Sequence, residues 1–193
     1  MKETPNFSGW HAALLHREDS MTDRLVRQLK LLGCSVTQQW QPLAADALPD
    51  IVLVDADQGW DGLLPWAGGT APRPLVALLG SEAPGRIAWA IQQGAGAVIA
   101  KPLSVSAVYP ALVMALGIHR ERIAISQKIE HLEERVRLRP LVHAAVQQIM
   151  AARKVDEHHA YNTLRNCAMK RRMAMEQMAA SIVGGAEPMP EAV

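Results

Sequence analysis

The stretch LVHAAVQQIMAARKVDEHHAYNTLRNCAMKRRMAMEQMAASIV (141–183) carries apolar and small residues at helical spacing. It contains three such runs, and each is too short to be stable as an isolated helix. Asp156 precedes the second run, where its carboxylate can accept hydrogen bonds from the amides of the first turn. We therefore predict a compact bundle of three short helices over 140–184. The residues assigned mainly to this bundle are Ala145, Met150, Ala160, Leu164, Ala168 and Met169.

The same stretch is basic. It has six Lys or Arg residues and three Asp or Glu residues, a net charge of about +3, whereas the whole chain carries +1. A small basic helical module attracts a nucleic-acid backbone because binding releases counterions. The alternative is a solvated face, since basic runs on helix surfaces often serve only to keep a protein soluble.

The bundle resembles the ANTAR domain, the RNA-binding three-helix module of bacterial transcription antitermination regulators. The matching residues are Ala145, Ile149-Met150, Asp156-Glu157, Ala160-Tyr161, Leu164-Arg165, Ala168-Met169, Ala179 and Ile182-Val183. The resemblance implies that the bundle binds RNA. The residues expected to contact RNA are Arg165, Lys170, Arg171 and Arg172, with Arg153 and Lys154 as secondary candidates.

The sequence departs from the ANTAR pattern at four positions in and after the first helix of the bundle. Val146 and Gln147 stand where the family usually has Lys-Gly. Leu141 replaces an Arg, and Lys154 replaces a turn glycine. These changes leave the predicted fold intact and affect which RNA contacts the first helix can make.

Residues 10–117 alternate short apolar runs with helical runs. Strands are expected at AALLH (12–16), IVLV (51–54), PLVALLG (74–80) and AVIAKP (97–102), and helices at 23–33 and 86–95. Continuous apolar strands between helices indicate a parallel sheet that is covered on both faces. We predict an α/β, flavodoxin-like doubly wound domain with its functional groups at the carboxyl ends of the strands. AGGTAPRP (67–74) is predicted to be a surface connection.

Two charged residues mark these strand ends: Asp55 follows the strand at 51–54, and Lys101 lies at the end of the strand at 97–102, before Pro102. The arrangement resembles the receiver domain of two-component response regulators, in which an Asp accepts phosphate and a Lys pairs with it. Receivers also need an acidic pair after the first strand to hold Mg²⁺, and here those positions are His16 and Arg17. We interpret the domain as a pseudo-receiver in which Asp55 pairs with Lys101 or Arg17. Phosphorylation of Asp55 is the alternative.

Residues 118–139 are predicted to continue the last receiver helix as a coiled coil. Charged residues flank an apolar stripe that is too narrow for ordinary globular packing. We favour a parallel two-stranded coiled coil that makes a homodimer, and the alternative is a helix lying on its own domain. Pro140 is expected to end or kink this helix. The predicted seam is Ile118, Ile125, Ile129, Leu132 and Val136.

Composition and the absence of certain motifs limit the classes of protein that fit this sequence. No apolar run approaches the ~20 residues needed to cross a bilayer, and MKETPNFSGW (1–10) lacks the pattern of a signal peptide. We expect a cytoplasmic protein with no membrane partner. Nucleophile motifs, phosphate-binding glycine loops and metal-ligand spacings are absent from the sequence, so we expect no catalysis, no cofactor and no metal. Residues 185–193 are predicted to be a disordered tail.

The resemblances imply a dimeric regulator that binds stem-loops in a leader transcript and stabilises an antiterminator. They further suggest control by a ligand-sensing negative-regulator protein rather than by phosphate. Two alternatives remain from the sequence. One is a phosphorylation-dependent response regulator acting on nucleic acid, and the other is a protein-interaction module that binds no nucleic acid.

Overall fold

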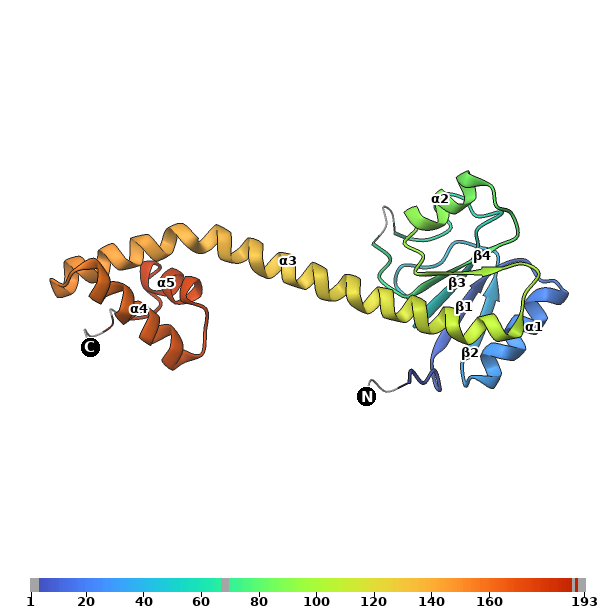
Figure 1. Cartoon of the computed structure of the whole chain (residues 1–193), viewed down its shortest axis with the longest axis horizontal. Coiled ribbons are helices and arrows are strands. Elements are labelled where there is room, and N and C mark those ends of the chain that lie inside the picture. The colour runs from blue at the N-terminus through green and yellow to red at the C-terminus, as the bar shows by residue number, and fades with distance from the viewer. Residues whose placement is uncertain (1–3, 67–69, 189, 191–193) are drawn as a thin grey trace. The chain divides into compact units, whose positions relative to one another are not determined.

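The computed structural model describes residues 4–66, 70–188 and 190 (Figure 1). The chain divides into two compact units, Met1–Ile123 and Ala124–Val193. Parts of three predicted features lie outside the described residues: residues 1–3 of the N-terminal segment, 67–69 of the surface connection, and 189 and 191–193 of the tail. Within the described ranges, none of the helices has the length and apolar character required to traverse a bilayer.

The first unit is built on a parallel five-stranded sheet. Its strands are β1 (His11–Leu15), β2 (Ser35–Gln39), β3 (Ile51–Asp55), β4 (Leu75–Leu79) and β5 (Ala97–Ala100), in the order β2-β1-β3-β4-β5. Every residue of β3 and β4 is buried, because these central strands are covered on both faces. The predicted α/β, flavodoxin-like fold is confirmed.

Helices cover both faces of this sheet. α1 (Ser20–Leu31) and the beginning of α3 (Val105–Arg153) pack on one face, where Leu25, Leu29 and Leu112 are fully buried. α2 (Pro84–Gln92) packs on the other face, together with the segments that follow β2 and β3. Because parallel strands all end at one edge, this topology brings the residues after β1, β3 and β5 together.

Local signals explain where α1 begins and ends. At its start, Asp19 and Thr22 form a capping box, in which the Asp19 carboxylate accepts hydrogen bonds from the Met21 and Thr22 amides. The chain then turns at Gly33, which has a φ of +88°. A Cβ at Gly33 would come within 2.8 Å of Ser8, so both the conformation and the space require glycine.

The second unit is a small helical bundle. The end of α3 packs with α4 (Glu157–Arg171) and α5 (Met175–Val183). Asp156 caps α4 as predicted, since its carboxylate accepts a hydrogen bond from the His159 amide at 2.8 Å. The buried core of the bundle contains Ala145, Val146, Ile149, Ala160, Leu164, Ala168, Met178, Ala179 and Ile182.

The structure contradicts one expectation about the bundle and part of another. Pro140 was expected to end or kink the helix, but α3 does not end there, so the first helix of the bundle is the end of a 49-residue helix. Proline removes only one helical hydrogen bond, and the burial of Ala145 and Ile149 on the far side keeps the chain helical. Met169 is 65% exposed rather than part of the interior. It lies about 100° around α4 from the buried Ala168.

The beginning of the predicted tail has defined structure. Gly185 takes a φ of +73°, and the Ala186 and Glu187 amides both donate to the Ser181 carbonyl. This turn closes the C-terminal end of α5. The apolar contacts of α5 with the bundle hold the segment from which the turn begins.

Candidate functional site

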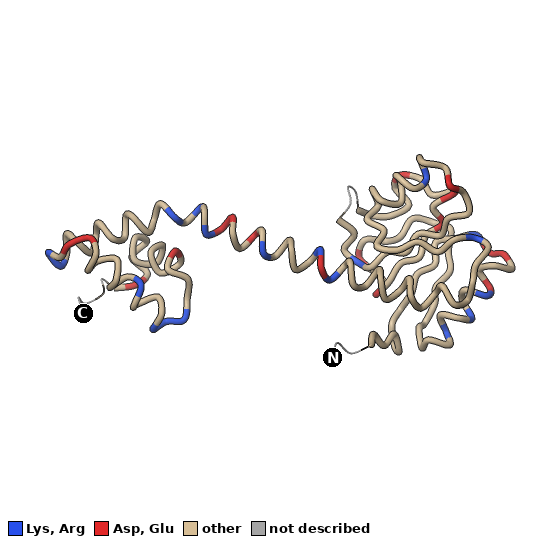
Figure 2. The backbone as a smooth tube through the Cα atoms, in the orientation of Figure 1, with Lys and Arg blue, Asp and Glu red and all other residues tan. Residues whose placement is uncertain are grey.

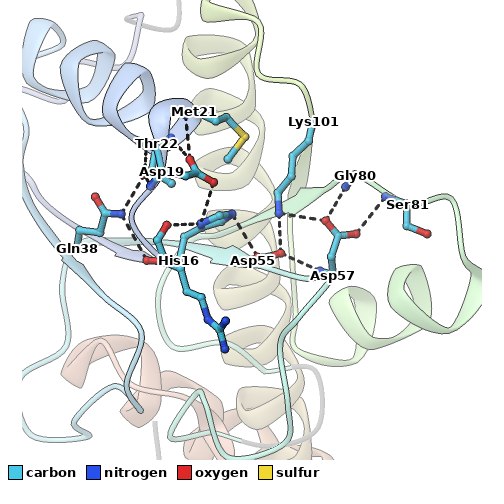
Figure 3. Close-up of polar contacts among 11 residues, drawn as sticks. His16, Asp19, Met21, Thr22, Gln38, Asp55, Asp57, Gly80, Ser81 and Lys101 are labelled. Carbon is cyan, nitrogen blue, oxygen red and sulfur yellow. Dashed lines mark hydrogen bonds and ion pairs between the residues drawn. The ribbon is translucent and has the colours of Figure 1, made fainter.

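The receiver-like site lies at the carboxyl end of β3, where Asp55 is only 2% exposed (Figure 3). One carboxylate oxygen, Oδ1, accepts hydrogen bonds from Lys101 Nζ at 2.7 Å and from the Asp57 amide at 3.0 Å. The other oxygen, Oδ2, lies 3.2 Å from His16 Nε2. Asp55 therefore lies between an ammonium group and an imidazole that can also carry positive charge.

His16 is held in one orientation by the backbone. Its Nδ1 lies 2.7 Å from the Arg17 carbonyl oxygen, which can only accept, so Nδ1 carries a proton. Its Nε2 is buried and near Asp55, but the contact lacks the alignment of a hydrogen bond, and among the described residues Nε2 has no hydrogen-bond partner. If Nε2 is also protonated, the ring becomes a cation that faces the carboxylate.

Asp57 is a member of this site that the sequence analysis missed. Its carboxylate accepts hydrogen bonds from the Gly80 amide at 2.7 Å and the Ser81 amide at 3.0 Å, and lies 3.0 Å from Lys101 Nζ. Burial works to raise the pKa of Asp57, but the hydrogen bonds from Gly80 and Lys101 outweigh it and lower that pKa. The available signal was a second aspartate two residues after the strand-end aspartate.

Lys101 makes the contact with Asp55 that was predicted, and Arg17 does not. The Arg17 guanidinium lies 6.0 Å from the centroid of the Trp40 ring, in a cation–π contact. Trp40 in turn packs edge-on against Trp60, with their ring centroids 5.1 Å apart. Of the two residues that follow β1, His16 contributes to the site, whereas Arg17 contacts Trp40, which packs against Trp60.

The residues around Asp55 do not fit a magnesium site. Mg²⁺ takes oxygen ligands in near-octahedral geometry, whereas Asp55 is contacted by nitrogen atoms of His16 and Lys101. Glu18 and Asp19 are the acidic residues between β1 and α1; Glu18 is exposed, and Asp19 caps α1 with its Oδ2 4.0 Å from His16 Nδ1. In the part of the chain that the structure describes, no group of three His, Cys, Asp or Glu residues could hold a metal ion.

The six residues predicted to contact RNA are all exposed in the second unit, and most lie at two helix ends (Figure 2). Arg153 ends α3, and Lys154 follows it with a φ of +55°. Lys170 and Arg171 lie in the last turn of α4, and Arg172 follows with a φ of +55°. Basic side chains at helix C-termini are favoured by the helix dipole.

The structure separates these residues into groups. Arg153, Lys170 and Arg171 line one pocket of about 340 Å³, beside α5. Arg165 lies in the middle of α4 on a different face, four residues from each of two exposed side chains, Tyr161 (42%) and Met169 (65%). Tyr161 therefore lies beside Arg165 on one face of α4.

The predicted dimer seam is exposed along most of its length. Ile125, Ile129, Leu132 and Val136 are between 46% and 70% exposed, and every residue from 120 to 133 lies at the surface. Ile118 differs, because it is half-buried beside Gly96 in the first unit. Arg122 interrupts the seam, and its guanidinium donates to the Gly94 carbonyl at 2.6 Å. The free apolar stripe therefore begins at Ile125.

Comparison with known proteins assigns both parts of the chain. Residues 10–116 match the family described as AmiR, N-terminal, and residues 130–183 match the ANTAR domain. The aliphatic amidase regulator of Pseudomonas aeruginosa is 33% identical over 177 residues, which cover 89% of each chain. The chain belongs to the AmiR family of ANTAR-domain proteins.

Other matches of this AmiR-family chain are more distant. The transcriptional regulatory protein PdtaR of Mycobacterium tuberculosis is 28% identical over 134 residues, which cover 68% of this chain and 65% of that protein. Among solved structures, the Rec1 domain of ShkA, crystallised with c-di-GMP, is 22% identical. That match covers 56% of this chain and 94% of the other, with a TM-score of 0.44.

Two departures from the ANTAR pattern have a structural explanation. Val146 is 3% exposed and contributes to the interior of the ANTAR bundle, so an apolar side chain suits this position. Lys154 stands where a turn glycine was expected, and its φ of +55° is the left-handed conformation that glycine adopts most easily. The backbone turn is therefore kept although the residue type has changed.

Proposed function

We propose that this AmiR-family chain is an RNA-binding transcription antitermination regulator that stabilises an antiterminator stem-loop in a leader transcript. The observation that supports this most is the ANTAR bundle, whose exposed basic side chains include Arg165, Lys170 and Arg171. Single-stranded RNA loops are bound by basic and aromatic side chains, and Tyr161 offers an exposed ring on the face of Arg165. The protein would act in the cytoplasm, without catalysis.

The proposed assembly is a homodimer. Isolated helices are marginal in water, yet α3 carries an exposed apolar stripe from Ile125 to Val136. A second copy of the same helix would bury this stripe as a parallel coiled coil, with the charged flanking residues remaining in solvent. Such a coiled coil would place two ANTAR bundles at the end of one rod, where each could bind one RNA loop.

The proposed control is by a partner protein that senses a ligand, rather than by phosphate. Phosphoryl transfer to Asp55 would need a metal ion beside it and access to its oxygens. Both oxygens are instead contacted from within the domain, by Lys101 and His16. Incubation with acetyl phosphate and Mg²⁺ should therefore leave the protein unlabelled, as measured by intact mass spectrometry. Stoichiometric labelling of Asp55 would favour the phosphorylation-dependent alternative.

An electrophoretic shift assay tests the RNA proposal. The probes are a pool of RNA stem-loops with randomised loops and a duplex DNA of the same length, each titrated across a salt series. We expect preference for the RNA pool, and a weaker dependence on salt after Arg165→Ala or Arg171→Ala. Removing the cation that binds one phosphate should reduce the slope of log K against log salt by roughly one.

The matched control is Arg24→Ala, which removes the same charge from an exposed position on α1. It should leave affinity and salt slope unchanged. Equal binding by the wild type and by Arg165→Ala and Arg171→Ala would contradict the proposed contacts. Preference for duplex DNA would contradict the proposed function itself.

A further inference from the structure

The segment that follows α5 contacts two of the residues proposed to bind RNA. The Arg171 Nη2 group donates to Glu187 Oε2 at 2.9 Å, and the Arg153 Nε group donates to the Pro190 carbonyl at 3.1 Å. Arg153 ends α3 and Arg171 ends α4. The tail therefore bridges the basic residues of two helix ends.

The position of Glu187 is set by the backbone. The Gly184 amide donates to the Ala180 carbonyl, and the Ala186 and Glu187 amides donate to the Ser181 carbonyl. This turn directs the chain back toward α4. The Glu187 side chain is only 26% exposed, compared with 60% for Arg171. The turn that ends α5 thus places Glu187 within ion-pair distance of Arg171.

The tail also forms one wall of the basic pocket. The pocket of about 340 Å³ is lined by Arg153, Lys170 and Arg171 together with apolar side chains that include Met178 and Ile182. Such a group of cations suits an RNA loop, because guanidinium groups bind phosphate oxygens and can stack on unpaired bases. Glu187, Pro188 and Pro190 line the same pocket.

We propose that the part of the tail formed by residues 185–188 and 190 is a built-in competitor of RNA at this pocket. The Glu187 carboxylate and the Pro190 carbonyl occupy guanidinium donors that RNA phosphate oxygens would use. RNA binding at full strength then requires the tail to move away. The competition is modest, because an ion pair exposed to solvent contributes little. This inference rests on the proposed RNA-binding function and deepens it, since it names how access to the site is restricted.

The test compares affinities for one RNA hairpin selected from the randomised pool, using the full chain, Glu187→Gln and a chain that ends at Ala186. We expect Glu187→Gln and the shortened chain to bind about two- to fivefold more tightly than the full chain. The matched control is Glu130→Gln, which removes the same charge from an exposed position on α3 and should change affinity little.

Affinities that are equal for the full chain and for Glu187→Gln, or that rise equally in Glu130→Gln, would overturn the tail inference while leaving RNA binding intact. Absence of hairpin binding by all four proteins would overturn the proposed function instead. Because the shortened chain could unfold, hydrogen–deuterium exchange of residues 184–188 in the full chain gives an independent measurement. Exchange should increase when the hairpin is added, and unchanged or slower exchange would contradict displacement of the tail.

Discussion

Asp55 and Asp57 lie two residues apart after a buried strand, yet their surroundings differ. Asp55 is contacted by side chains from the ends of β1 and β5, His16 and Lys101. Asp57 is held largely by backbone amides, those of Gly80 and Ser81. The hydrogen bonds to Asp57 favour its ionised form, so the stability of the N-terminal unit should depend on pH.

Lowering the pH should destabilise the N-terminal unit through Asp57. Its pKa in the folded protein is lowered, so the ionised form stabilises the fold above the unfolded pKa of about 3.9. This contribution disappears as the pH falls through the folded pKa. Urea unfolding followed by tryptophan fluorescence measures it, since all five tryptophans lie before residue 124.

The comparison is between the wild type and Asp57→Asn. At pH 7 the variant should be less stable, by roughly 1 to 3 kcal/mol, because Gly80 and Lys101 no longer have a charged acceptor. Below about pH 4 the difference should shrink, because Asp57 of the unfolded wild-type chain then takes up a proton before Asp57 of the folded chain does. A difference that stayed constant down to pH 2 would show that the ionisation of Asp57 does not stabilise the fold.

Lys154 allows folding and binding to be separated. Its left-handed φ of +55° costs a residue with a side chain about 1 kcal/mol relative to glycine. Lys154→Gly should therefore raise the unfolding free energy of the ANTAR bundle by about that amount and lower RNA affinity, because a cation is removed. The matched variant Lys154→Ala removes the charge and keeps the strain, so it should lower affinity without adding stability. Thermal unfolding and hairpin titration measure the two effects.

At the residue scale, contacts between side chains could be predicted from the sequence where the fold topology alone brings the residues together. Asp55 and Lys101 end parallel strands, so their meeting follows from the fold. The fate of Arg17 could not be predicted, because its direction depends on a tryptophan in the segment after β2. Asp57 was missed because most of its hydrogen-bond partners are backbone amides, and residue types in the sequence do not indicate where backbone amides will lie.

At the scale of the elements, α3 connects the two units. The apolar side chains in its middle remain exposed in a single chain. Ile129 is 51% exposed and Val136 is 70% exposed on a helix that has charged residues on its other faces. The length of α3 was underestimated because Pro140 was expected to end or kink the helix. Proline penalises a helix locally, whereas the packing that holds α3 beyond it is tertiary and does not show in the local sequence.

Placing a charge on the seam should separate the proposed dimer. The double variant Ile129→Asp, Val136→Asp would bury two carboxylates in the coiled coil, which should weaken association on the order of 100-fold or more. Sedimentation equilibrium at micromolar concentration measures the mass. The control is Gln127→Asp, which adds a charge at an exposed position that is not on the seam. A wild-type chain that sedimented as a monomer would contradict the dimer.

On the scale of the whole molecule, the proposed functions of regulation and RNA binding belong to different units. The N-terminal unit keeps the receiver-like sheet, with its strand-end aspartate paired internally. The ANTAR bundle carries the exposed basic residues, and part of this surface is contacted by the tail. The sequence was sufficient to predict both folds because continuous apolar strands mark the sheet and apolar residues at helical spacing, together with the ANTAR resemblance, mark the bundle. It could not reveal the tail contacts, which depend on the turn after α5.

The most direct test of the central claim is single-round transcription through a leader that contains a selected hairpin followed by an intrinsic terminator. Wild-type protein should increase the fraction of transcripts that pass the terminator, and an Arg165→Ala, Arg171→Ala variant should not. Termination that stays unchanged at protein concentrations that saturate the hairpin would contradict the antitermination function.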